Sequence, residues 1–230
     1  LGLNRNEDFI DAETETADVL LRVTTTKNTK PLQLNDLFAC LNNAEWKGKA
    51  NQLSADNRIH WDVSNEMSIR CEKPATDTQH WTPPNYPPMT RCDSDLDASS
   101  VIRQRRSAQA FAKQTVLPLT QFYRMLDALL PRQKTTPFDT LNWQPRLHLV
   151  LFVHRVEGLK PGLYVFPRSE SGETLFRENM RDAFDWSRPA ICPESLPLYH
   201  LVSANSQNAS RTLSCHQDIA SDGAFSIAML

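Results

Sequence analysis

The sequence predicts a soluble fold of mixed helices and strands, and three segments carry this prediction. Leu147-His-Leu-Val-Leu-Phe-Val153 is apolar at successive positions, which is typical of a strand buried on both faces of a sheet. Gly162-Leu-Tyr-Val-Phe166 predicts a second strand, joined to the first by a turn that contains Gly158 and Pro161. Residues 120–131 place apolar side chains at three- and four-residue spacing, which predicts an amphipathic helix ahead of these strands in the sequence.

The remaining elements follow from shorter patterns. Ser99 or Ser100 is expected to cap a helix that runs through the Arg103-Gln-Arg-Arg106 cluster. Further helices are predicted near 34–41 and 174–184, and further strands over 19–25 and 196–202. Small residues spaced three and four apart from about Gln207 to Leu230 predict one long helix. Its close packing against a second helix, or its packing on the sheet of its own domain, is equally compatible with this pattern.

Prolines mark the most evident boundary in the chain. Five of the fifteen prolines fall between Pro74 and Pro88, and they remove backbone donors that a sheet would need. We therefore expect an irregular linker over 74–98. It separates a small α+β segment at 31–73 from a larger domain at 99–230.

Composition excludes several classes of function. The 25 Lys and Arg residues nearly balance 27 Asp and Glu residues, so no overall charge favours nucleic acid or an acidic membrane. No segment is long and apolar enough to span a bilayer, and the five scattered cysteines fit a reducing cytoplasm. His148 and His154 would lie about 20 Å apart on one strand at ~3.3 Å per residue, too far to share a metal ion. The six glycines form neither a dinucleotide-binding nor a Walker phosphate loop.

The Arg103-Gln-Arg-Arg-Ser107 run is the strongest candidate for a ligand site. Three guanidinium groups and a hydroxyl suit an anion such as a phosphate, because arginine presents a fixed fork of donors. A solvated basic face near a helix C-terminus is the alternative, and residue chemistry alone favours it.

Four segments of the larger domain resemble one enzyme family. They are Ile102-Arg-Gln-Arg-Arg-Ser-Ala-Gln-Ala-Phe111, Leu117-Pro-Leu-Thr-Gln-Phe-Tyr-Arg-Met-Leu126, Val156-Glu-Gly-Leu-Lys-Pro-Gly-Leu-Tyr164 and Leu213-Ser-Cys-His-Gln-Asp-Ile-Ala-Ser-Asp-Gly-Ala-Phe225. They resemble the nitroreductase-fold flavin oxidoreductases, and the segment ending at Tyr164 is similar to a hairpin of the SagB/ThcOx-type dehydrogenase branch.

This resemblance implies an α+β, nitroreductase-like fold with an antiparallel or mixed sheet flanked by helices. It also implies FMN at an interface between two such units, and ping-pong hydride transfer with a small molecule or a peptide azoline, nitro or quinone group. NAD(P)H would be the candidate reductant. Carried over by position, Arg105 and Ser107 would contact the FMN phosphate, Arg106 would lie beside the flavin, and Gln109 would lie near the pyrimidine edge of the ring.

The resemblance further implies a tandem arrangement. Residues 1–30 would be the tail of a preceding nitroreductase-like unit, and residues 99–230 would be a second unit that is incomplete at its C-terminus; a homodimer would supply the same pairing. The partner would then be a second unit together with a small-molecule or peptide substrate. The alternative is a cofactor-less scaffold or peptide-recognition unit. It is favoured by the uncharged Gln109, which stands where the family usually has Arg or Lys, and by Leu141-Asn-Trp-Gln-Pro-Arg146, which replaces a flavin-lining segment.

Overall fold

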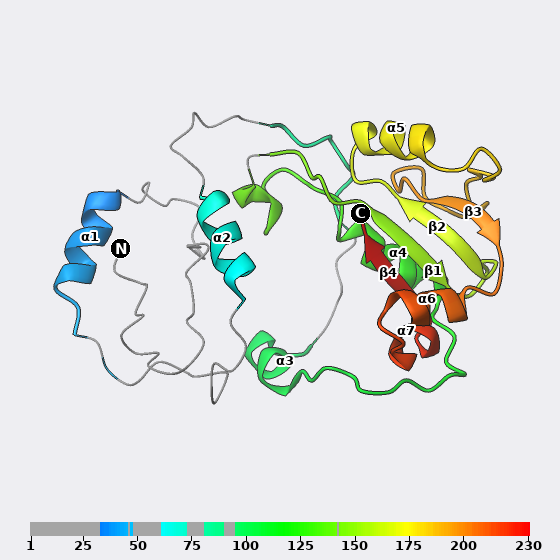
Figure 1. The fold of residues 1–230 in the computed structure, drawn as a ribbon, viewed down its shortest axis with the longest axis horizontal. Coiled ribbons are helices and arrows are strands. Elements are labelled where there is room, and N and C mark those ends of the chain that lie inside the picture. The colour runs from blue at the N-terminus through cyan, green and yellow to red at the C-terminus, as the bar shows by residue number, and fades with distance from the viewer. Residues whose placement is uncertain (1–32, 46, 48–60, 73–80, 90–94, 142) are drawn as a thin grey trace. The chain divides into compact units, whose positions relative to one another are not determined.

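The computed structural model describes residues 33–45, 47, 61–72, 81–89, 95–141 and 143–230. The chain divides into two units, Leu1–Thr76 and Asp77–Leu230. The strand predicted over 19–25 lies outside the described residues. The colours of Figure 1 follow the chain from one unit to the other.

The described part of the first unit consists of two short helices. They are α1 (Leu34–Asn42) and α2 (Asp62–Arg70), and the first coincides with the helix predicted near 34–41. Trp61 and Val63, at the start of α2, are exposed. No strand is present among residues 33–45 and 61–72.

The second unit contains a four-stranded sheet with helices around it (Figure 1). Its elements are α3 (Ala98–Gln104), α4 (Leu119–Asp127), a 3-10 helix η2 (Phe138–Thr140), β1 (Leu149–Val153), β2 (Gly162–Phe166), α5 (Glu170–Asn179), β3 (Tyr199–Ser203), α6 (Gln207–Leu213), α7 (Asp218–Asp222) and β4 (Phe225–Met229). The strand order is β3-β2-β1-β4, and every pair is antiparallel. The unit is therefore α+β with an antiparallel sheet.

The central strand β1 separates two layers of core. Leu149, Leu151 and Val153 face α4, where they pack with side chains that include Phe122 and Leu126. The intervening Val150 and Phe152 belong to the opposite layer, which contains Phe176 of α5. All five residues of β1 are buried, so the prediction of a strand covered on both faces is confirmed.

The hairpin that joins β1 to β2 also agrees with the sequence. β2 has the predicted bounds, and Gly158 in the connecting turn has a φ of 72°, a conformation that glycine adopts without steric strain. Gly162 lies so close to β3 that a Cβ at this position would be 2.1 Å from the carbonyl oxygen of Val202. Glycine is thus required where β2 begins to pair with β3.

Two predicted helices have different limits in the structure. α3 is capped by Asp97, whose carboxylate accepts from the backbone N–H of Ser100, and it ends at Gln104 because Arg105 is extended. The helix predicted over 174–184 is α5, which begins after the Ser169 cap. The Arg cluster is therefore only partly helical.

The single long helix predicted from Gln207 to Leu230 is wrong. The chain forms α6, then a turn in which Cys215 and His216 have φ values of 55° and 60°, then α7 and β4. Two successive left-handed residues break a right-handed helix. β4 is stabilised by its full pairing with β1, from Phe225 opposite Val153 to Met229 opposite Leu149.

Part of the predicted linker packs within the second unit. Residues 81–89 contain no helix or strand, as expected from their prolines. Tyr86 nevertheless packs on the core layer that contains α4, and the buried guanidinium of Arg132 lies 5.6 Å from the centre of its ring. Arg132 also donates to the carbonyl oxygen of Pro87 at 2.9 Å and pairs with the carboxylate of Asp127. These contacts fix residues 86–87 to the end of α4.

Candidate functional site

A cluster of polar side chains gathers where β1 ends. His154 and Arg155 follow the strand directly, and their backbone N–H groups both donate to the carbonyl oxygen of Ala224, at 2.9 and 2.8 Å. The same region contains Ser206, which precedes α6, and the end of α7. The sheet thus brings together segments that are about fifty or more residues apart in the sequence.

His154 is the buried centre of this cluster. Its Nε2 lies 3.2 Å from the carbonyl oxygen of Ala220, and its Nδ1 lies 3.4 Å from Oγ of Ser206. Because a carbonyl can only accept, Nε2 is assigned the proton, and Nδ1 then accepts from the Ser206 hydroxyl. Burial lowers the pKa of His154; the Ala220 hydrogen bond opposes this shift, and the positive charge of Arg155 adds to it. The ring is therefore neutral at pH 7.

The Ser206–His154 contact is longer than the usual hydrogen bond between a nucleophile and its base. Their separation of 3.4 Å exceeds the ~2.6–3.2 Å over which a base takes a hydroxyl proton. Ser210 lies 3.3 Å from Nε2 of His154 and donates to the carbonyl oxygen of Gln207. The hydrogen bonds of Ser210 are therefore made within the cluster. The hydroxyls and the imidazole form a fixed polar wall.

Arg155 joins two other segments to this wall. Its guanidinium donates to the backbone carbonyl oxygens of Thr115, Asp222 and Gly223, at 3.3 Å for Thr115 and 3.0 Å for Gly223. Lys113 lies two residues before Thr115 in the chain and forms an ion pair with Asp222 at 3.3 Å. A positively charged corner results, next to the neutral His154.

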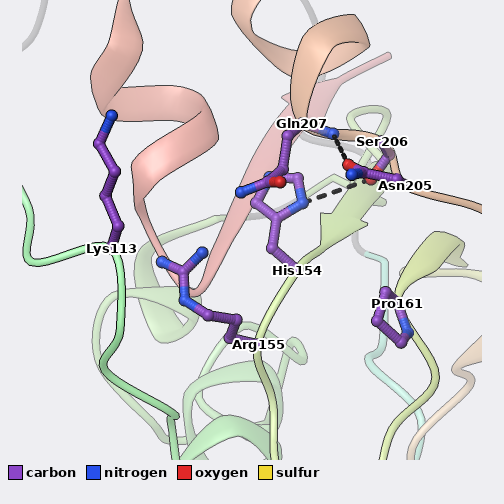
Figure 2. A pocket seen from close by; sticks show the side chains of 7 residues that line it. All are labelled: Lys113, His154, Arg155, Pro161, Asn205, Ser206 and Gln207. Carbon is purple, nitrogen blue, oxygen red and sulfur yellow. Dashed lines mark hydrogen bonds between the residues drawn. The ribbon is translucent and has the colours of Figure 1, made fainter.

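These side chains line a cavity of about 500 Å³, shown in Figure 2. In that view Lys113 and Arg155 lie on the left, and Asn205, Ser206 and Pro161 lie on the right, with His154 between them. The seven lining residues are Lys113, His154, Arg155, Pro161, Asn205, Ser206 and Gln207. Two of them are cations and none is a carboxylate, so the cavity suits an anionic group.

The four residues that the sequence assigned to FMN lie elsewhere in the second unit. Arg105, Arg106, Ser107 and Gln109 are all exposed, on the irregular segment that follows α3, and none lines the cavity. Arg106 donates to the carbonyl oxygens of Arg103 and Arg105 at 3.0 and 2.9 Å. Within the described part of the chain, the other three side chains form neither hydrogen bonds nor ion pairs.

The cavity was not predicted from the sequence. His154 was expected to be structural, and its burial and hydrogen bonds agree with that expectation. No sequence pattern indicated a role for Lys113 or Arg155, although Arg155 comes soon after an apolar run that predicts a strand. A cation at the end of a buried strand was the available signal, and only the fold brings Lys113 to the same place.

Two kinds of feature are absent from the residues that the structure describes. No group of three or more His, Cys, Asp or Glu side chains there is arranged to hold a metal ion. No helix in that part of the chain has the length and apolar character needed to cross a membrane.

Comparison with known proteins gives no family assignment. No family model matches this sequence, and no curated protein matches it significantly.

Proposed function

We propose that residues 99–230 are an FMN-dependent oxidoreductase unit of the nitroreductase type. Such a unit would transfer hydride by a ping-pong mechanism between NAD(P)H and a small-molecule or peptide acceptor in the cytoplasm. The proposal rests on the four sequence segments that resemble this family and on one structural observation: Arg103, Arg105 and Arg106 are exposed, and no carboxylate among the described residues pairs with them.

The chemistry of this basic run fits a phosphate. The FMN phosphate carries nearly two negative charges near neutral pH, and arginine forks are well matched to its oxygen atoms. Ser107 can add a short hydroxyl bond. The α+β fold with an antiparallel sheet is compatible with the proposal at the level of fold class.

The exposure of these residues implies a second surface. A single unit leaves Arg105, Ser107 and Gln109 open to water, so a bound flavin ring would need cover from another chain segment. A second nitroreductase-like unit, in tandem or as a homodimer, would provide it. When bound, FMN would supply the hydride chemistry, while these side chains would hold its phosphate and ring edge.

A cofactor-less scaffold or peptide-recognition unit is the second candidate. Its support is that Gln109 donates hydrogen bonds without supplying the positive charge that stabilises a reduced flavin. In this case the basic run would remain a solvated surface.

Titration of the complete protein with FMN, followed by visible absorption and fluorescence quenching, distinguishes the two. The oxidoreductase predicts saturable binding. Arg105→Ala should then weaken it by roughly ten- to a hundredfold, as for loss of a charged hydrogen-bond partner, with a far smaller effect on riboflavin. Arg181→Ala, which removes an exposed arginine outside both the run and the segment at 141–146, is the matched control. Absence of saturable FMN binding at micromolar concentrations would support the scaffold instead.

A further inference from the structure

We propose that the cavity at the end of β1 is a second anion site, which binds the phosphate group of a small phosphomonoester through Arg155 and Lys113. It would be separate from the FMN phosphate residues, and it does not depend on the proposed flavin chemistry. The argument rests on the charges, the hydrogen-bond partners and the size of the cavity.

The balance of charge in the cavity is positive. Arg155 has three hydrogen-bond acceptors, all of them backbone carbonyls, and no carboxylate of the described residues lies within ion-pair distance of it. Among the residues that the structure describes, Asp222 is the one acid that contacts a lining cation, at 3.3 Å from Lys113. Two positive charges therefore meet one negative charge, next to a neutral His154.

The guanidinium of Arg155 is held in place before any ligand arrives. Arg155 is fixed by carbonyl groups from two separate segments, which positions its planar donor fork. Its Nη1 takes part in no hydrogen bond with the residues described, so this atom keeps its donors for a ligand. A fixed donor loses little conformational entropy on binding, and affinity benefits accordingly.

The polar rim favours an acceptor as the ligand. Oδ1 of Asn205 already accepts from the backbone N–H of Gln207 at 3.2 Å, which leaves the Asn205 amide N–H₂ available. Nε2 of Gln207 donates one hydrogen bond, to the carbonyl oxygen of Ser221 at 3.0 Å. Three groups keep donors for a ligand: the Lys113 ammonium, which has N–H groups beyond the one directed at Asp222, Arg155 Nη1 and the Asn205 amide.

Size and donor geometry select the ligand class. A fork and a point charge suit a tetrahedral phosphate. The volume of about 500 Å³ falls within the range of small-molecule pockets, ~300–1,000 Å³, which leaves room for an organic part beside Pro161. Inorganic phosphate would share the same contacts without filling the remaining space.

The test is calorimetric titration of the complete protein at constant ionic strength with three probes: inorganic phosphate, glycerol 3-phosphate and glycerol. Saturable binding of glycerol 3-phosphate, tighter than that of phosphate, with none of glycerol, is the expected result. Equal affinity for phosphate and glycerol 3-phosphate would overturn the proposal that the ligand has an organic part. Absence of saturable binding of either at millimolar concentrations would overturn the proposal of an anion site.

Variants identify the side chains responsible. Lys113→Ala, which alters an exposed residue, should weaken glycerol 3-phosphate roughly ten- to a hundredfold. Arg155→Lys keeps a cation and should weaken it also, because the fork is lost. Lys134→Ala removes an exposed lysine elsewhere and should change nothing. Equal weakening by Lys134→Ala would mean that binding reflects only general charge attraction, which would overturn the inference.

Loss of glycerol 3-phosphate binding in Arg105→Ala, or loss of FMN binding in Lys113→Ala, would show that the two sites are one and overturn the inference.

Discussion

Gly172 of α5 lies against His148, which precedes β1, so closely that only glycine fits at position 172. A Cβ placed on Gly172 would be 2.1 Å from Nε2 of His148 and 2.2 Å from its Cε1. The imidazole cannot easily move away. It is buried, accepts from the backbone N–H of Arg168 at 3.1 Å, and meets the Phe176 ring edge-to-face at 5.6 Å. Helix α5 thus rests on the histidine through a glycine.

Gly172→Ala should therefore destabilise the second unit by about 1–2 kcal/mol. Overpacking a fixed site costs about 1–3 kcal/mol, which exceeds the gain of up to about 1 kcal/mol from replacing a helical glycine. Urea denaturation measures the difference. In a His148→Ala background the same substitution should be neutral or stabilising, because the obstacle has been removed. Equal destabilisation in both backgrounds would mean that the contact is not responsible.

Arg132→Ala should be among the most destabilising single changes in the second unit. The substitution leaves the largely buried Asp127 without its partner, and loss of one member of a buried ion pair costs about 3–5 kcal/mol. It also removes the donor that holds Pro87. Chemical denaturation should show the loss of stability, and limited proteolysis should show earlier cleavage within residues 81–89.

Arg211→Ala is the control for this prediction. Arg211 pairs with Asp218 on the surface, where such pairs contribute only about 0–1 kcal/mol. A similar loss of stability in both variants would indicate that burial of Arg132 carries no special weight.

The sheet could be predicted only where its pattern is local. β2 was placed correctly because a glycine turn precedes an apolar run, and β1 because its continuous apolar character matches burial on two faces. Within residues 207–230, small side chains at three- and four-residue spacing suggested a helix. The left-handed Cys215 and His216 have no sequence signature, and β4 is specified by its pairing with a strand more than seventy residues earlier.

The candidate sites divide in the same way. Arg105, Arg106 and Ser107 stood out because they are neighbours in the sequence, and their role with FMN stays a prediction. The cavity combines Lys113, His154 and Asn205, which are about forty to fifty residues apart from one to the next. Its members are ordinary residues until the antiparallel sheet brings their segments together.

The last prediction concerns acid, and it follows from three buried histidines. Burial lowers the pKa values of His148, His154 and His200, although the nearby Asp185 partly opposes the shift at His200. Below the ordinary histidine pKa of about 6.5, the unfolded chain therefore binds more protons at these positions than the folded chain does. Their contribution to stability is complete above about pH 6.5 and declines as the pH falls below it. The urea midpoint should consequently drop between pH 7 and pH 5.5.

His154→Asn should make that decline shallower, since it removes one of the three groups, whatever the variant's stability at pH 7. His216→Asn, which removes an exposed histidine, is the matched substitution for comparison. If His154→Asn keeps the full wild-type dependence on pH, the buried ring is not what destabilises the protein in acid.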